Sequence, residues 1–271
     1  MAQLNINLDP GVYSVYSELV DSTYGDFNAT ANVTVLTTIY GNDTVLYYHD
    51  GTKYNALFLD EQGNPLKNTT VTFNINGVTY TRTTNENGTT SGLTINLNPG
   101  TYIITATNPE NGEMHSNNIT VVPTIITSNL VKYYRNGSQF VVKAIDKNGQ
   151  GLYNQTVTFN INGVFYTRTT DYNGSATLNI NLAALNGKET DYIITTECNG
   201  CTVSNTVTVL PVITGEDISI PYQSGGKYTV NVCDGQGRPE QGVNITLNIH
   251  GVFYYRTSDI NGQVSVDINL Q

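Results

Sequence analysis

The chain has 271 residues, of which 38% are hydrophobic and 13% charged; 22 Asp and Glu against 12 Lys and Arg give a net charge of −10. This charge argues against nucleic-acid binding, which depends on clustered Lys and Arg against phosphates. No apolar run reaches the roughly 18 residues of a spanning helix, so no membrane insertion is predicted either. Thr, Asn, Gly and Tyr prevail over strong helix formers, so the predicted fold class is all-β.

The first 37 residues match only the later half of a repeat that returns along the chain. Residues 6–13 correspond to residues 95–102, and residues 32–36 correspond to residues 118–122. The opening residues lack a charged and apolar leader, so no signal peptide is expected. A start inside a repeat suggests a piece of a longer array.

One stretch, residues 71–84, recurs at 157–170 and more loosely at 245–258. In its first copy the apolar Val71, Phe73 and Ile75 alternate with polar residues, the period of a strand with one buried face. The Asn-Gly pair that follows favours a tight hairpin turn. Each copy therefore predicts a β-hairpin, and the spacing of 86 and 88 residues predicts one small β-domain per repeat, as measured between Gly77, Gly163 and Gly251.

The repeats divide the chain into four predicted domains: 1–37, the later half of a repeat; 38–123 and 124–211, two whole repeats; and 212–271, the opening part of a third. Seven strands are predicted in the first whole repeat, at about 43–48, 53–60, 69–75, 78–84, 90–97, 101–107 and 116–122. Short antiparallel strands with this alternation predict tandem immunoglobulin-like β-sandwiches. Linkers of two or three residues after Pro123 and Pro211 predict an elongated rod.

Two acidic turn patterns also recur. One begins at Asp60, Asp146 and Asp234, and the other at Asn85, Asp171 and Asp259; each ends in Gly three residues later. Acids at alternate positions, which a calcium loop needs, are missing, so these patterns predict turns. The histidines, His49, His115 and His250, do not recur at equivalent places. We therefore predict no catalytic, cofactor-binding or metal site and no enzymatic activity.

Cys198 and Cys201 bracket Asn199-Gly200, a hairpin-turn signal, and could form a disulfide. Further Cys or His ligands for zinc are missing nearby. Cys233 stands where the other copies have Leu59 and Ile145, so we interpret it as a small apolar residue.

Two other sets of residues are candidates for modification or contact. Arg82, Arg168 and Arg256 recur two residues after a Tyr, and either form an outward contact row or, as we favour, pair with a cross-strand acid or stack on Tyr. Lys132 and Asn205 could meet in an isopeptide crosslink. N-glycosylation acceptors of the Asn-x-Ser/Thr type occur at Asn28, Asn32, Asn42, Asn68, Asn87, Asn118, Asn136, Asn154, Asn173 and Asn244.

The repeat resembles a known family on a string of motifs. Tyr134, Gly137 and Phe140 are followed by Asp146 and Gly149 and then by residues 157–174; residues 96–106 and 116–121 fit the same pattern in the first repeat. This string resembles the bacterial Ig-like repeats of adhesin-like surface proteins from methanogenic archaea. Two segments depart from it, the Cys198–Cys201 hairpin and residues 183–186.

The resemblance implies a cell-surface, extracellular protein with an adhesive or stalk-like role. Its expected partners are other cells or surface glycans. The alternative is a filament subunit that polymerises head to tail, with residues 1–37 of one chain completing residues 212–271 of another. A third hypothesis is a non-catalytic accessory array of a cell-wall enzyme.

Overall fold

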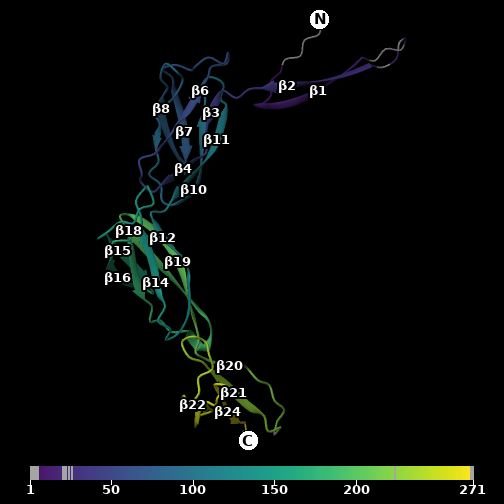
Figure 1. Cartoon of the computed structure of the whole chain (residues 1–271). Helices are drawn as coiled ribbons and strands as arrows, with labels where there is room; N and C mark the ends of the chain where they lie inside the picture. The colour runs from purple at the N-terminus through teal and green to yellow at the C-terminus, as the bar shows by residue number, and fades with distance from the viewer. Residues whose placement is uncertain (1–5, 20–22, 24, 26, 223, 269–271) are drawn as a thin grey trace. The chain divides into compact units, whose positions relative to one another are not determined.

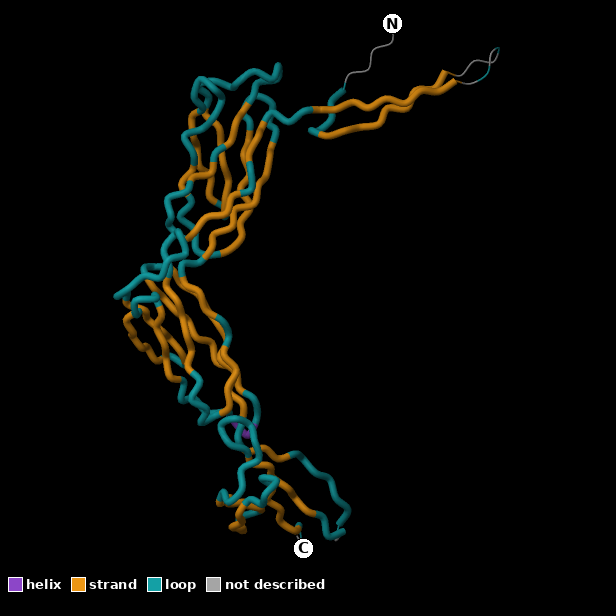
Figure 2. Tube along the Cα trace, viewed as in Figure 1, coloured by secondary structure: helices purple, strands orange, loops and turns teal. Residues whose placement is uncertain are grey.

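The computed structural model describes residues 6–19, 23, 25, 27–222 and 224–268. Strands and turns account for nearly all of it, and the one helical element there is a single 3₁₀ turn, η1 (Leu185–Gly187), so the all-β prediction is confirmed (Figure 2). No helix in the described part is long and apolar enough to cross a membrane. The chain forms two compact units, residues 1–122 and 123–271.

The first unit opens with a hairpin of β1 (Gly11–Leu19) and β2 (Phe27–Val35), in register from Gly11 opposite Val35 to Leu19 opposite Phe27. At its base the Tyr13 hydroxyl donates to the Asp9 carbonyl at 2.7 Å. The same contact recurs before two later hairpins, from Tyr102 to Asn98 at 2.8 Å and from Tyr192 to Ala183 at 2.7 Å. The hairpin is therefore built like the last hairpin of a complete sandwich.

Residues 38–122 fold into the first sandwich (Figure 1). One layer is a five-stranded sheet in the order β4 (Thr44–Tyr47), β11 (Met114–Val122), β10 (Gly100–Thr107), β7 (Thr70–Ile75) and β8 (Val78–Thr83), with β4 parallel to β11. The other layer consists of β3 (Ile39–Gly41), β6 (Ala56–Phe58), β5 (Lys53–Tyr54) and β9 (Leu93–Thr94). Between them the rings of Tyr54, Phe58 and Phe73 pack edge to face, all fully buried.

Three strand predictions in this sandwich need correction. The short β3 was missed, the strand predicted at 53–60 is broken at Asn55, and the one at 90–97 shrinks to β9. The break has a local cause. Tyr54 pairs with Leu93 and Leu57 pairs with Thr89, so an interval of three residues on one strand lies opposite an interval of four residues on the other. This extra residue makes a β-bulge.

The second sandwich repeats the frame without the bulge. Its five-stranded layer runs β13 (Leu130–Tyr133), β19 (Cys201–Leu210), β18 (Thr190–Cys198), β15 (Thr156–Ile161) and β16 (Val164–Thr169). Its other layer is a continuous three-stranded sheet of β12 (Ile125–Thr127), β14 (Gln139–Ala144) and β17 (Ser175–Asn179). Phe140 and Phe159 meet edge to face across the core, with ring centroids 6.1 Å apart.

The third module contains the matching three-stranded sheet of β20 (Ile213–Gly215), β21 (Lys227–Val232) and β24 (Gln263–Asp267). Opposite it, within the part of the chain that the structure describes, lies a single hairpin of β22 (Asn244–Ile249) and β23 (Val252–Thr257). A smaller core of Val230, Val232, Leu247, Val264 and Val266 joins the two layers.

The predicted acidic turns are confirmed in all three modules. Asp60 Oδ1 accepts the backbone N–H groups of Gln62 and Asn64 at 2.9 and 2.8 Å, and Asp146 and Asp234 accept the equivalent pairs. These backbone N–H donors hold the pKa of each of the three carboxyls below its usual range. The aspartates therefore act on their own turns.

Lys132 occupies a core position. It stands where the first sandwich has Leu46, and both are buried, with 6% and 3% of their surface exposed. Its Nζ donates to the carbonyls of Ile180 at 2.8 Å and Ser138 at 3.2 Å, and burial lowers the pKa of the amine.

The Lys132–Asn205 crosslink prediction is wrong on geometry. Lys132 lies opposite Val209 on β19, whereas Asn205 lies four residues earlier and donates to Asn129. At about 3.3 Å per residue, some 13 Å of strand separates the two positions, beyond the combined reach of the side chains.

We expect Lys132→Leu to raise the free energy of unfolding of the second sandwich by about 1–3 kcal/mol, because a buried ammonium with two carbonyl acceptors is replaced by the residue of the first sandwich. The wild type should gain stability as pH rises from the lowered folded-state pKa to the ordinary 10.5, since the unfolded state binds more protons there. Urea unfolding followed by amide NMR from pH 7 upward measures both effects. A pH profile that Lys132→Leu leaves unchanged would contradict this account, and Leu46→Lys is the converse control.

Candidate functional site

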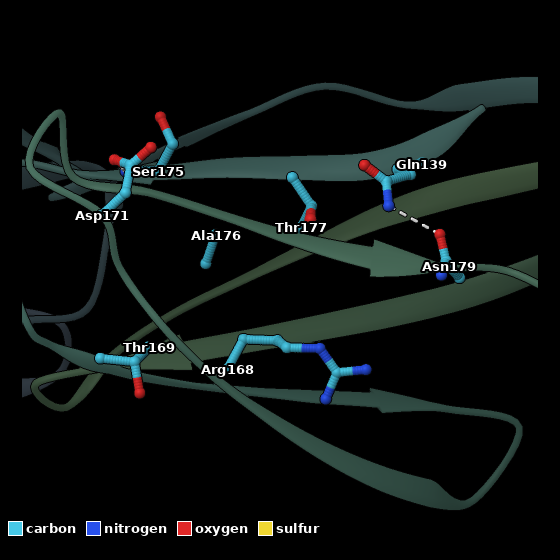
Figure 3. Close-up of a pocket in the computed structure, with 8 residues that line it drawn as sticks. All are labelled: Gln139, Arg168, Thr169, Asp171, Ser175, Ala176, Thr177 and Asn179. Carbon is cyan, nitrogen blue, oxygen red and sulfur yellow. Dashed lines mark hydrogen bonds between the residues drawn. The ribbon is translucent and has the colours of Figure 1, made fainter. Parts of the chain in front are cut away.

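A hollow of about 310 Å³ opens along one seam of the second sandwich, where β16 of one layer runs beside β17 of the other (Figure 3). Arg168 and Thr169 form one border. The strand from Ser175 to Asn179 forms the other, and Figure 3 shows the Arg168 side chain extending along the hollow. The full lining is Gln139, Arg168, Thr169, Asp171, Ser175, Ala176, Thr177 and Asn179.

Seven of the eight lining residues carry polar side chains. Gln139 Nε2 donates to Asn179 Oδ1 at 2.7 Å, and Arg168 Nη1 donates to the Thr167 carbonyl at 2.7 Å. Asp171 Oδ1 accepts the N–H groups of its own turn from Asn173 and Ser175 at 2.9 and 2.8 Å. Ala176 is the one apolar side chain among the lining residues. The hollow therefore suits a small polar ligand with several hydrogen-bonding groups.

The first sandwich closes the same seam. There the bulge turns the Gly92 carbonyl toward Arg82, whose Nε donates to it at 3.1 Å, and Thr90 bridges to Thr84. Gly92 has φ +84°, the left-handed conformation that such a bulge requires. The second sandwich has one residue fewer between the turn glycine, Gly174, and the buried Leu178. It therefore forms no bulge.

The recurring arginines do not pair with acids in the described residues. In each, Nη1 donates to the carbonyl of the preceding residue, at 2.7 Å for Arg82 and Arg168 and 2.9 Å for Arg256. Stacking on Tyr is found for Arg256, whose guanidinium lies 5.9 Å from the Tyr254 ring centroid. The acid-pairing prediction is thus wrong, and the Tyr prediction is confirmed at one position.

Cys198 and Cys201 lie directly opposite each other at the tip of the β18–β19 hairpin. Both are buried free thiols, and Asn199 and Gly200 between them have φ 51° and 81°, as the predicted tight turn demands. Burial raises the pKa of the Cys198 thiol, with Glu197 and Cys201 adding to the effect. The disulfide stays a prediction, as does the interpretation of Cys233 as a small apolar residue.

We expect oxidised glutathione to join this pair, because cross-strand partners lie about 5.5 Å apart at Cα, within the range of a disulfide. The intact mass should fall by about 2 Da, with one bond formed and two thiol hydrogens lost to the oxidant. Cys198→Ser should abolish the loss, and Cys233→Ser should not. Glutathione adducts at both thiols in place of the mass loss would contradict the pairing.

The predicted glycosylation acceptors are mostly accessible. Nine of the ten side chains are exposed, and Asn136 is half-buried because its Nδ2 donates to the Gly235 carbonyl at 2.6 Å. Their modification stays a prediction for Asn28, Asn32, Asn42, Asn68, Asn87, Asn118, Asn136, Asn154, Asn173 and Asn244.

Sequence reasoning singled out Arg168 but missed the hollow beside it. The described residues hold no group of three or more His, Cys, Asp or Glu that could bind a metal. A usable signal did exist: the repeat alignment loses one residue between Gly174 and Leu178 relative to Gly88 and Leu93. The effect of this missing residue on the seam can be worked out only when the pairing of the strands is known.

No family model and no curated protein matches this chain. Among solved structures, it is similar to a Ca²⁺-stabilized adhesin of an ice-binding Antarctic bacterium, at 20% identity over 95% of this chain and 73% of that one, with a TM-score of 0.22. It is similar to the adhesin InvE of Yersinia pseudotuberculosis at 16% identity over 80% and 73%, TM-score 0.29, and to a chimeric titin Z1Z2 tandem at 14% over 63% and 95%, TM-score 0.32. These matches assign no function to the chain.

Proposed function

We propose that this chain is a non-enzymatic, extracellular adhesion or stalk protein built from tandem Ig-like sandwiches. One observation carries the proposal: the buried frame is repeated while an exposed position on its edge strand varies. Phe73, Phe159 and Leu247 fill the same core position. On the strand beside it, Thr79 of the first module becomes Phe165 and Phe253, which are 69% and 57% exposed.

This pattern is typical of a protein whose modules share a support and differ in what they contact. Exposed aromatic side chains are enriched where proteins bind partners. The edge strands β16 and β23 also leave one side of the backbone unpaired within the described sheets, so a partner can reach it. Other cells and surface glycans are the proposed partners.

Binding of the fluorescently labelled chain to whole cells tests the proposal. We expect the double variant Phe165→Thr and Phe253→Thr, which copies Thr79, to lower the affinity at least fivefold, about 1 kcal/mol. Ile103→Thr is the matched control, since Ile103 is 63% exposed on the first module. Binding no stronger than that of an unrelated tandem sandwich protein rules the adhesive role out.

Self-association is a second candidate function, favoured by the open edge of β22. In the complete first sandwich β10 pairs beside β7, with Ile104 opposite Ile75. In the third module β22, the counterpart of β7, pairs only with β23 within the described residues. Ile220, at the position of the buried Leu46 and Lys132, is 39% exposed, and its segment forms no strand.

The β1–β2 hairpin has the register to fill this edge. In this hairpin Val15 pairs with Ala31, just as Ile104 pairs with Asn117 in the β10–β11 hairpin of the first sandwich. Val33 then takes the position of the buried Ile119. A hairpin from a second copy would set Val15 beside Ile249 of β22. Asn32 would then face Asp217, repeating the 2.8 Å hydrogen bond in which Asn118 N–H donates to Asp43.

Sedimentation velocity and electron microscopy of the 271-residue chain test self-association. Ser17→Lys places a charge at the position of the fully buried Ala106 and should leave monomers, whereas Ser14→Lys, on the opposite face of β1, should still assemble. A wild-type chain that stays monomeric at micromolar concentration excludes the filament.

A further inference from the structure

We propose that the seam hollow of the second sandwich binds a sugar that carries a carboxylate, such as a uronic acid residue of a glycan. The proposal deepens the adhesion function, and it rests on that function where it takes a glycan as the source of the sugar. The site itself is argued from the chemistry of its lining, the size of the hollow and the contrast with the first sandwich.

Arg168 supplies the recognition of the acid. A guanidinium carries five N–H donors, and only Nη1 of Arg168 has a protein acceptor among the described contacts, the Thr167 carbonyl. In the first sandwich Nε of Arg82 is occupied by the Gly92 carbonyl. The edge of Arg168 that carries Nε is therefore available, unlike that of Arg82, and this planar fork matches a carboxylate with two parallel hydrogen bonds.

The remaining lining suits the hydroxyl groups of a sugar ring. Gln139 and Asn179 provide amides that both donate and accept, and hydroxyls come from Thr169, Ser175 and Thr177. A volume of about 310 Å³ lies at the lower end of small-molecule sites, which span roughly 300–1,000 Å³. It holds one ring and not a long apolar ligand.

A stacked aromatic pair lies on the turn at the end of this hollow. Tyr172 follows Asp171, and its ring stacks on Tyr153 with centroids 4.1 Å apart and planes at 3°. The two side chains are 81% and 51% exposed, so their faces can pack against the apolar face of a neighbouring sugar unit. In the first sandwich these two positions hold Lys67 and Glu86, which form a 3.8 Å ion pair. The second sandwich thus combines an open hollow with an aromatic surface.

The test is an NMR titration of the intact chain with D-glucuronate and, as the neutral analogue, D-glucose. Glucuronate should shift the amide signals of residues 168–179, at millimolar concentration, and glucose should bind about tenfold more weakly. Arg168→Gln should weaken glucuronate binding about tenfold, while Arg82→Gln in the first sandwich should leave it unchanged. Replacing residues 175–177 with the sequence of residues 89–92 transplants the bulge and should abolish binding.

Three outcomes overturn the site: no shift with either sugar, equal affinity for both, or full binding by Arg168→Gln. Native-like amide spectra of each variant keep these outcomes separate from misfolding. If glucuronate binds as described and whole cells do not, the adhesion proposal fails and the sugar site stands. If cells bind equally well to Arg168→Gln, adhesion uses another surface.

Discussion

Gly88→Ala should destabilise the first sandwich by about 3 kcal/mol or more. Gly88 ends the turn that begins at Asn85, and its φ is +74°. A Cβ there would lie less than 3.0 Å from the Phe58 carbonyl oxygen. That oxygen cannot retreat freely, because it accepts the N–H of Leu66 at 2.9 Å, while Phe58 N–H donates to the Gly88 carbonyl at 2.8 Å. The methyl group therefore disrupts the joint between two strands of one layer.

The matched control is Gly77→Ala in the hairpin turn of the same sandwich. Gly77 has nearly the same φ, +76°, but open space where its Cβ would stand. It should cost only the left-handed backbone penalty, about 1–2 kcal/mol. Chemical unfolding of the two variants separates the clash from the backbone term. Equal losses of stability would show that the close approach at Gly88 does not matter, and Gly174→Ala and Gly262→Ala, which meet the Ala144 and Val232 carbonyls, extend the comparison.

The strand-turn-strand repeat could be predicted because its signals are local. Alternation of Val71, Phe73 and Ile75 with polar residues specifies a buried face, and all three are buried. The Asn-Gly turn needs positive φ at both residues, and Asn76 and Gly77 have it.

Features that depend on the opposite layer could not be predicted in this way. The single residue inserted before Leu93 is visible in the repeat alignment, but whether it bulges outward or shortens a strand depends on its partner β5. Closure of the seam by Arg82 follows only from that bulge. Likewise Lys132 has the sequence context of a surface residue, and its burial is set by strand β13 entering the core-facing position of Leu46.

Two positions whose residues differ together between the two sandwiches show how one residue depends on another in its surroundings. Gly41 and Tyr54 of the first sandwich correspond to Thr127 and Phe140 of the second. The buried Tyr54 hydroxyl donates to Asn117 Oδ1 at 2.6 Å, and burial, with a smaller contribution from Asp43, raises the pKa of Tyr54 to about 12. A Cβ on Gly41 would lie under 3.0 Å from that hydroxyl and from Asn117 Oδ1, so the hydrogen-bonded pair of Tyr54 and Asn117 requires the glycine.

The second sandwich shows the consequence of the alternative pair. Phe140 has no hydroxyl to donate, and Oδ1 of Asn205, the counterpart of Asn117, is buried without a hydrogen-bond partner among the described residues. Thr127 occupies the space left free and donates to the Val141 carbonyl at 3.1 Å. Replacing both residues together with Thr127→Gly and Phe140→Tyr should therefore stabilise the second sandwich by giving Asn205 a donor.

In the first sandwich, Gly41→Thr alone should cost about 2–3 kcal/mol through the clash, and Tyr54→Phe alone about 1–2 kcal/mol through the orphaned amide oxygen. The double variant removes the hydroxyl that the threonine meets, so it should cost 1–3 kcal/mol less than the sum, about the coupling of residues in contact. Urea unfolding of the four proteins measures the cycle. Ile103→Thr combined with Tyr54→Phe, at an exposed position on the other layer, should be additive. Additivity in the Gly41–Tyr54 cycle as well would mean that the glycine is not retained for the tyrosine.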